Sequence, residues 1–378
     1  MIDRKLLLQI AQIYGTPSYV YDLEDVRQRY LDLKDQLKGL NATIHYAVKA
    51  NPHPKILHTL HELGAGVDCV SFQEVAHTLK FGFLPSEILY TPSCPSEEEL
   101  TKAMELGVHV HIGALEYLPW IAKNYPGRPV GLRLNPGVYG GATPKTATAH
   151  KNSKFGIPAE QIDRLLEMVK KLSLQITGLH VHIGSDVESL NDLTAGVDFL
   201  TGLVPYFPDL QYLDFGSGFK VPYKPEEPAM DLTAYMDHVA QRMKNFPHLQ
   251  VKFEPGKYLV ARSGILLMRV NVVKRTPYKN FAGVNTGFNH MLRPMYYGAY
   301  HHIVNLSAPN AKPEKYDVVG NLCEEDTFAR NRELPRLEPG HILALQNAGA
   351  YGFVMASHYN LRPLPQEIIV DGTRIYES

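Results

Sequence analysis

The chain has 378 residues, of which 44% are hydrophobic and 20% charged, as in an ordinary globular protein with a sizeable core. Its formal net charge is -1, and the acidic and basic residues are spread along the chain. This pattern provides no basic patch for a nucleic acid and no cationic stretch for an anionic membrane. We therefore expect a small-molecule ligand, and neither nucleic acid nor membrane as a partner.

The cysteines and the amino-terminal segment predict a cytoplasmic protein. Cys69, Cys94 and Cys323 have no metal-ligand spacing and cannot form an even set of disulfides, so we predict a reducing compartment and no bound metal. No apolar window reaches the length of a membrane span, and the first residues lack the pattern of a signal peptide.

The first predicted elements are two helices and two strands, and the second strand ends at a lysine. An amphipathic helix is predicted within residues 1–16, a short strand at 17–21 and a charge-rich helix at about 23–37. The apolar run at 44–48 then predicts a buried strand that ends at Lys49, before the turn of Asn51-Pro52. Burial lowers the pKa of a lysine, and the neutral amine can form a Schiff base. A single lysine at a strand end is more often a surface residue, so the rest of the chain must decide its role.

Strand-like runs then alternate with helical patterns at intervals of about one βα unit. Counted from residue 44, there are eight such runs, which predicts a (β/α)₈ TIM barrel with a parallel sheet. They lie at 44–48, 66–70, 87–90, 108–112, 130–134, 176–183, 210–215 and 251–254. The link between the fifth and sixth runs begins with a segment rich in Gly, Thr and Lys, 137–156, which predicts either a mobile loop over the barrel mouth or a disordered surface insertion.

The pattern changes after residue 257 to β-type runs without long helices between them. These runs lie at 264–273, 281–284, 316–319, 342–345 and 367–370, and they predict an all-β domain, either a β-barrel or a sandwich. The strand at 17–21 can pair with this domain and make it discontinuous. We therefore expect a barrel over 24–256 and a β domain made of 1–23 and 257–378.

Chemically useful residues recur where the predicted barrel strands end, which is where barrel enzymes place their active sites. A lone His is more often structural, a Gly-Ser-Gly is usually a turn, and Glu-Pro-Gly is a common strand terminator. Their arrival together at one end of one barrel favours an active site instead. The residues are Lys49, Asp68, Arg133, His180, His182, Ser185, Gly216-Ser217-Gly218 and Glu254-Pro255-Gly256-Lys257.

The glycine-rich turn after the seventh strand predicts a phosphate site. Gly216, Ser217 and Gly218 have little side-chain bulk, so their backbone N–H groups can approach an anion closely. A phosphate site together with a reactive lysine points to pyridoxal 5′-phosphate (PLP). Glu254 can then keep the pyridine nitrogen protonated, and His182 can stack on the ring.

The chain also resembles the fold-type III PLP decarboxylases, most closely those that act on diaminopimelate. The resemblance extends from Tyr14 to Asn360 and rests on an ordered set of motifs, which is far more specific than any one of them. The motifs are Tyr46-Ala47-Val48-Lys49-Ala50-Asn51, His180 to Ser185, Asp214 to Phe219, Glu254-Pro255-Gly256-Lys257, Arg293-Pro294-Met295-Tyr296-Tyr297, Cys323-Glu324-Glu325-Asp326 and Gly349-Ala350-Tyr351.

This resemblance implies a role for each site residue. Lys49 corresponds to the PLP lysine, His182 to the ring-stacking residue, Glu254 to the pyridine partner and Cys323 to the proton donor. The resemblance also implies a homodimer in which the partner subunit donates the Cys323-Glu324 segment to a shared active site. Further cofactor contacts are implied for Ser185, Gly216, Ser217, Gly218, Gly256, Lys257 and Tyr351, and substrate contacts for Lys257, Arg293, Tyr297, Glu324 and Tyr351.

Two residues depart from the family pattern. Ser217 stands in the middle of what is usually a triple glycine, and Lys257 stands where the family usually has an arginine. The lysine keeps the charge but loses the bidentate fork that grips a carboxylate. The first change leaves the phosphate site intact, whereas the second affects how the substrate carboxylate is held.

The implied reaction is decarboxylation of meso-diaminopimelate to L-lysine and carbon dioxide, the last step of lysine biosynthesis. Lys257 keeps open a second carboxylated diamine, carboxynorspermidine, as the substrate. An amino-acid racemase is disfavoured because Glu254 would stabilise the carbanion too fully. A non-catalytic PLP-binding regulatory homologue would be expected to have lost Lys49 or Cys323, and both are present.

Overall fold

A computed structural model describes residues 2–141 and 143–377. Met1 and Ser378, at the ends of the predicted β domain, and Ala142, in the predicted 137–156 loop, lie outside the described residues.

Eight parallel strands close into a barrel, which confirms the predicted TIM-barrel class. Each strand pairs in parallel with its neighbours, and the pairings β10–β2 and β5–β6 complete the ring. All six residues of β6 and of β8 are buried, as expected for strands covered on both faces. The barrel strands are β2 (Ala42–Ala47), β3 (Gly66–Cys69), β4 (Ile88–Tyr90), β5 (His109–Ile112), β6 (Val130–Asn135), β8 (Ile176–Val181), β9 (Tyr212–Asp214) and β10 (Gln250–Phe253).

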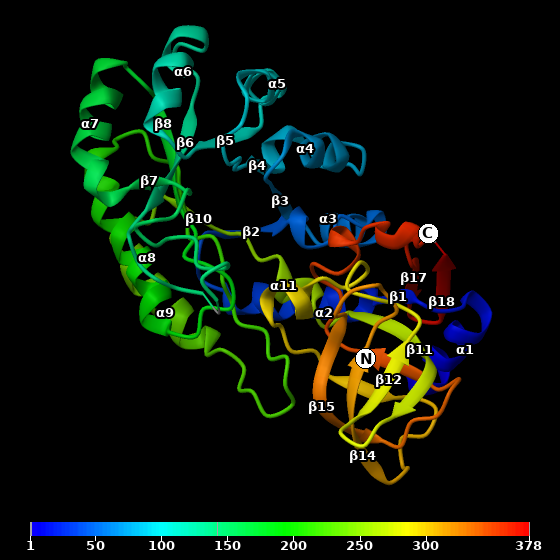
Figure 1. Ribbon diagram of the computed structural model, residues 1–378. Helices are drawn as coiled ribbons and strands as arrows, with labels where there is room; N and C mark the ends of the chain where they lie inside the picture. Colours follow the sequence, from blue (N-terminus) through cyan, green and yellow to red (C-terminus); the bar gives the residue numbers. More distant parts are fainter. Residues whose placement is uncertain (1, 142, 378) are drawn as a thin grey trace.

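Helices connect these strands and cover the outside of the barrel, as Figure 1 shows for the green helices α7 to α9. They are α2 (Leu23–Gln36), α3 (Pro54–Glu62), α4 (Phe72–Leu79), α5 (Glu97–Leu106), α6 (Leu118–Asn124), α7 (Ile162–Lys171), α8 (Leu190–Leu203) and α9 (Leu232–Met243). The short β7 (Ile157–Pro158) pairs with β6 outside the ring.

A second, mostly β domain packs beside the barrel (Figure 1). Its strand β1 (Ser18–Asp22) pairs antiparallel with β11 and parallel with β17, so the amino-terminal strand belongs to this domain, as predicted. The helix α1 (Arg4–Tyr14) buries Leu7 and Ile10 against the same sheet. The other elements are β11 (Gly264–Arg275), β12 (Asn280–Val284), β13 (Ile303–Asn305), β14 (Pro313–Val319), β15 (Thr327–Pro335), β16 (Ile342–Leu345), β17 (Gln366–Asp371), β18 (Arg374–Glu377), α10 (Lys257–Val260) and α11 (Arg293–Tyr297). The boundaries after residues 23 and 256 remain our proposed division of the chain.

Two features differ from the sequence-based expectation. Lys49 does not lie on a strand, because β2 ends at Ala47 and a short 3₁₀ turn, Val48–Ala50, carries the lysine. The strands β7, β13, β15 and β18 are additional to those predicted.

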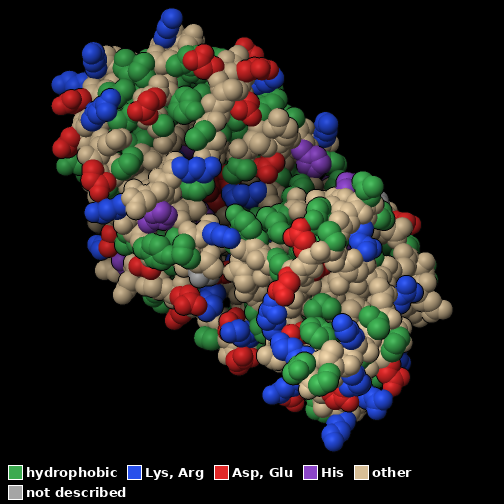
Figure 2. All heavy atoms as spheres, viewed as in Figure 1, with side chains coloured by type: hydrophobic (Ala, Val, Ile, Leu, Met, Phe, Trp, Pro, Cys, Tyr) green, Lys and Arg blue, Asp and Glu red, His purple; other side chains and the backbone are tan. Residues whose placement is uncertain are grey.

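The turn after Lys49 connects the two domains. The side-chain amide of Asn51 donates to the carbonyl oxygen of Gly349 at 2.9 Å, and the backbone N–H of Tyr351 donates to the carbonyl oxygen of Ala50, also at 2.9 Å. The mouth of the barrel therefore faces the β domain. Figure 2 shows Lys and Arg side chains around the hollow between the two domains.

Candidate active site

Lys49 lies at the barrel mouth with its amine held by an acid. Its Nζ donates to Oδ2 of Asp68 at 2.8 Å, and Asp68 is buried at the end of β3. Burial, the largest single influence, lowers the pKa of Lys49, but Asp68, Tyr351 and Glu254 together raise it, and the net pKa lies above that of an ordinary lysine. The expectation of a lowered pKa was therefore wrong, because a sequence does not reveal the carboxylate beside the amine.

A cavity of about 470 Å³ opens beside Lys49, between the barrel mouth and the β domain. It brings together residues that are far apart in the sequence and that the sequence had singled out. These are Lys49, His182, Ser185, Lys257, Arg293, Tyr297 and Tyr351. A cavity of this size accommodates a cofactor together with a small substrate.

A smaller cavity of about 40 Å³ adjoins it and has the features of a phosphate site. Its wall includes the small residues Ser185, Ser217, Gly218 and Gly256, and it also includes larger ones, Lys49, His182, Glu254, Lys257 and Tyr351 among them. A Cβ on Gly218 would lie 2.7 Å from the carbonyl oxygen of Gly184, so only glycine fits there. Gly216 does not line this cavity, unlike Gly218 and Gly256. Its N–H already donates to Oδ1 of Asp214 at 2.8 Å.

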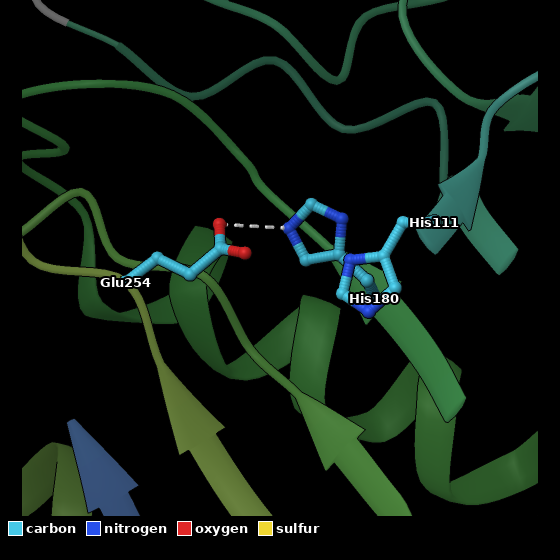
Figure 3. Close-up of side chains that lie close together, drawn as sticks. All are labelled: His111, His180 and Glu254. Carbon is cyan, nitrogen blue, oxygen red and sulfur yellow. Dashed lines mark ion pairs between the residues drawn. The ribbon is translucent and has the colours of Figure 1, made fainter. Parts of the chain in front are cut away.

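Glu254 follows β10 and lines the smaller cavity. The residue is buried, and burial raises the pKa of its carboxyl group. Figure 3 shows its Oε2 pointing at Nε2 of His180, 3.1 Å away. The other oxygen, Oε1, is buried and accepts from no N–H group of the described residues, and the neighbouring Asp214 carboxyl group interacts with Glu254 and lowers its pKa.

His111, His180 and Glu254 form a cluster whose ligand atoms lie within 4.8 Å of one another (Figure 3). The two imidazole rings are stacked, with centroids 5.0 Å apart and planes 15° apart, so their nitrogens point in parallel and do not converge on one point. Both nitrogens of His111 are also occupied, by the hydroxyl groups of Thr91 at 2.9 Å and Tyr212 at 2.8 Å. This geometry favours a packed polar cluster over a metal centre.

His182 borders both cavities as a neutral ring. Its pKa is well below the usual value because of burial and the positive charges of Arg133 and Lys49. Its Nδ1 accepts a hydrogen bond from the backbone N–H of Ser217 at 3.4 Å, which ties the ring to the glycine-rich turn. A neutral, fixed imidazole is suited to stacking on an aromatic ligand.

Arg293, on α11, supplies a buried cation to the larger cavity. Its Nη1 donates to the hydroxyl oxygen of Tyr223 at 2.6 Å and lies 3.2 Å from Nε2 of His301. The pKa of His301 is lowered to about 3, mainly by burial and then by Arg293, so that ring is neutral. No Asp or Glu of the described residues forms an ion pair with Arg293, whose remaining N–H groups are available to a carboxylate.

Lys257, the departure from the family pattern, is paired within the chain. It is buried at the start of α10 and forms an ion pair with Asp186. Burial lowers the pKa of Lys257 to about 8, even though the Asp186 carboxylate acts in the opposite direction. The sequence did not single out Asp186, which directly follows the predicted phosphate contact Ser185.

Described residues of the 137–156 segment lie at the barrel mouth. The backbone N–H groups of Thr148 and Ala149 both donate to the carbonyl oxygen of Ile183, at 3.1 and 3.2 Å. The side chains of Thr143, Thr146 and Thr148 line the larger cavity. Neither these threonines nor Tyr223, which lines the same wall, was predicted, because their residue types carry no distinctive pattern.

Cys323 and Glu324 lie away from both cavities in this chain. The two residues are exposed on a loop of the β domain and are absent from the described lining of either cavity. Asn360 donates from Nδ2 to the thiol sulfur at 3.3 Å, and the Tyr359 hydroxyl donates to Oε1 of Glu324 at 2.5 Å. These contacts present the thiol and the carboxylate to the outside of the chain.

The chain matches a known domain and full-length proteins. Residues 23–261 match the family described as pyridoxal-dependent decarboxylase, pyridoxal binding domain. A diaminopimelate decarboxylase from Methanothermobacter thermautotrophicus is 36% identical over 96% of this chain and 88% of its own length. The corresponding Escherichia coli K12 protein is 33% identical over 97% of this chain and 91% of its own length.

A solved structure has the same fold over nearly the whole chain. The diaminopimelate decarboxylase of Helicobacter pylori, complexed with L-lysine, superposes with a TM-score of 0.91 at 32% identity, covering 98% of this chain and 95% of its own. None of the helices in the described part of our chain combines the length and apolar character that crossing a membrane requires.

Proposed function

Since this chain belongs to the diaminopimelate decarboxylase family of pyridoxal-dependent decarboxylases, we propose that it removes one carboxylate of meso-diaminopimelate as carbon dioxide and so produces L-lysine. The observation that carries this proposal is the shared cavity. It combines a lysine suited to hold the cofactor with a buried arginine, Arg293, suited to hold a distant carboxylate. We further propose that the protein acts in the cytoplasm.

The residues present fit PLP. Oε1 of Glu254 is a buried acceptor that accepts from no N–H group of the described residues, which matches a protonated pyridine nitrogen, and His182 is a neutral ring suited to stacking. When bound, PLP supplies an electron sink for the negative charge left by the departing carbon dioxide. We assign the phosphate to the small cavity with Ser185, Ser217, Gly218, Gly256, Lys257 and Tyr351, and keep Gly216 as a support of that turn.

Lys49 is the residue that we expect to hold the cofactor covalently. Asp68 keeps the lysine amine at the edge of the cavity through the 2.8 Å hydrogen bond and accepts its proton when the amine reacts. The raised pKa of Lys49 therefore describes a resting ammonium that needs a base, and Asp68 is the carboxylate in contact with it.

The far end of the substrate carries a carboxylate and an ammonium. We assign Arg293, Tyr297 and Tyr351 to the part of the cavity that surrounds this end. Lys257 contributes a second positive charge there. We assign Glu324 to the ammonium and Cys323 to the return of a proton to the reacting carbon. Because both residues lie outside the cavity of their own chain, we propose that they act in the cavity of a partner subunit of a homodimer.

The test measures carbon dioxide release from meso-diaminopimelate, carboxynorspermidine, L-lysine and L-ornithine by the PLP-loaded protein. We expect meso-diaminopimelate to be the best substrate. Arg293→Ala should raise its KM at least about tenfold, because a buried carboxylate loses its charged partner. Lys224→Ala, which removes a half-exposed cation at the rim of the same cavity, is the matched control.

Carboxynorspermidine is kept in the panel because Lys257 replaces the usual arginine and is already paired with Asp186. If carboxynorspermidine is the better substrate, or if Arg293→Ala leaves the substrate preference unchanged, the proposal for meso-diaminopimelate is wrong.

A further inference from the structure

The ion pair of Asp186 and Lys257 contains one of the two residues that depart from the family pattern, Lys257, and it forms part of the cavity wall. Side-chain exposure is 7% for Lys257 and 16% for Asp186, so the pair is largely shielded from bulk water. Both residues line the larger cavity, on the same wall as Arg293. A buried charge pair that borders a ligand cavity is placed to interact with charged ligand groups.

The backbone around Asp186 fixes the direction of its carboxylate. The residue has a φ of 54°, a left-handed conformation that Asp and Asn tolerate better than most residues. Its Oδ1 accepts a hydrogen bond from the backbone N–H of Val221 at 3.3 Å, and its Oδ2 contacts Nζ of Lys257. Each carboxylate oxygen has two lone pairs, so the group retains acceptor capacity toward the cavity.

Tyr223 joins this pair to Arg293. The guanidinium carbon of Arg293 lies 4.6 Å from the centre of the Tyr223 ring, and Nζ of Lys257 lies 5.8 Å from the same centre. The wall around this ring therefore carries two cations, Lys257 and Arg293, and one anion, Asp186. A ligand group with one carboxylate and one ammonium can set its carboxylate against the two cations and its ammonium against the anion, whereas an ammonium alone would place a third cation beside a single anion.

We propose that Asp186 is a specificity-determining residue that accepts a hydrogen bond from the far ammonium of the substrate, while Arg293 and Lys257 hold the far carboxylate. This inference rests on the proposed function and deepens it, because it adds to Glu324, assigned above to the same ammonium, a second acceptor that lies in the cavity of its own chain.

The product of the proposed reaction is a suitable probe of this group. Decarboxylation replaces a carboxylate by hydrogen at the reacting carbon and leaves the far carbon unchanged. L-Lysine therefore keeps the far ammonium and carboxylate, and presents its side-chain amine to the cofactor end. Two analogues each lack one of these groups: 6-aminohexanoate has no far ammonium, and cadaverine has no far carboxylate.

The experiment measures the dissociation constants of the three ligands for the PLP-loaded protein by isothermal titration calorimetry. We expect L-lysine to bind at least about tenfold more tightly than 6-aminohexanoate, because a charged hydrogen bond is lost in the analogue. In Asp186→Asn this ratio should fall toward about one through weaker L-lysine binding. Glu188→Gln, which removes an exposed carboxylate that lines the same cavity and pairs with Lys220, should leave the ratio unchanged.

Three outcomes would overturn the proposal. The first is an unchanged ratio in Asp186→Asn, and the second is an equal weakening of L-lysine and 6-aminohexanoate, which would mean that Asp186 only positions Lys257. The third is loss of the ratio in Glu324→Gln with its retention in Asp186→Asn, which would assign the ammonium to Glu324 alone.

PLP content, measured by absorbance, accompanies every titration. If Asp186→Asn does not retain PLP, Asp186→Ser is titrated in its place, and failure of both to retain PLP overturns the proposal by making Asp186 a cofactor residue. Failure of the proposed function is a separate result, because it appears as absent carbon dioxide release by the unmodified protein.

Discussion

Because residue 257 is a lysine and not an arginine, the positive charge that it brings to this site depends on pH. Burial lowers its pKa to about 8, so the ammonium is present below that pH and is lost above it. We predict that 6-aminohexanoate binds progressively more weakly as the pH rises from about 7 to about 9.5, because the ligand carboxylate loses one of its two cations. In Lys257→Arg the guanidinium stays charged throughout this range, so its binding curve should be flat. Parallel curves for the two proteins would contradict the assignment.

Residues with distinctive chemistry were the ones that the sequence could identify. Lys49, His182 and Glu254 follow apolar runs, and the prediction that they gather at one end of the barrel agrees with the cavity linings. Asp186 and Tyr223 could not be identified in this way, because their importance comes from contacts with Lys257 and Arg293 across about 70 residues of sequence. The raised pKa of Lys49 depends in the same way on its distance to Asp68.

Among the elements, α3 begins with an unusual cap that should make the fold sensitive to acid. Nδ1 of His53 accepts a hydrogen bond from the backbone N–H of Lys55 at 3.1 Å, and only an unprotonated nitrogen can do so. Burial, and then the charge of Lys55, lowers the pKa of His53 from 6.5 to about 4. The folded state thus binds fewer protons than the unfolded state, and stability falls as the pH drops from about 6.5 toward 4.

We predict that protonation of His53 lowers the free energy of unfolding by on the order of 3 kcal/mol between pH 6.5 and pH 4. The variant His53→Asn keeps a capping side chain but has no group that titrates there. It should be less stable than the unmodified protein at pH 7.5, because it loses a buried ring, and this difference should shrink toward pH 4. Thermal unfolding of both proteins across this range measures the difference, and a gap that stays constant with pH would argue against the role of His53.

Barrel strands were easier to predict than the strands of the β domain. A barrel strand is buried on both faces and therefore appears as a continuous apolar run, as in β8. The strands β15 and β18 lie at the ends of their sheet order and carry charged residues such as Arg330, Arg332 and Arg374, which is typical of sheet edges. The strand β13 has only three residues, too few for a pattern.

At the scale of the whole molecule, the position of Cys323 predicts that one chain cannot complete its own active site. We expect Lys49→Ala and Cys323→Ala to be inactive as separate preparations. After subunit exchange, hybrid dimers contain one site with an intact Lys49 and an intact partner-derived Cys323, so part of the activity should return. Light scattering verifies the dimer, and mass spectrometry verifies the exchange. Verified hybrids without recovered activity would assign Cys323 to the site of its own chain.

The pairing of β1 with both β11 and β17 has a consequence for the synthesis of the protein. The ribosome makes β1 before the whole barrel and makes its parallel neighbour β17 more than 340 residues later, a delay of roughly 20 to 70 s at ordinary translation rates. During this interval all eight barrel strands can form, whereas the β domain still lacks a strand. Arg293 and Tyr351 reside in that unfinished domain, so the nascent chain acquires Lys49 long before the residues that discriminate among substrates. We therefore expect the growing polypeptide to remain without substrate selectivity until its two ends meet.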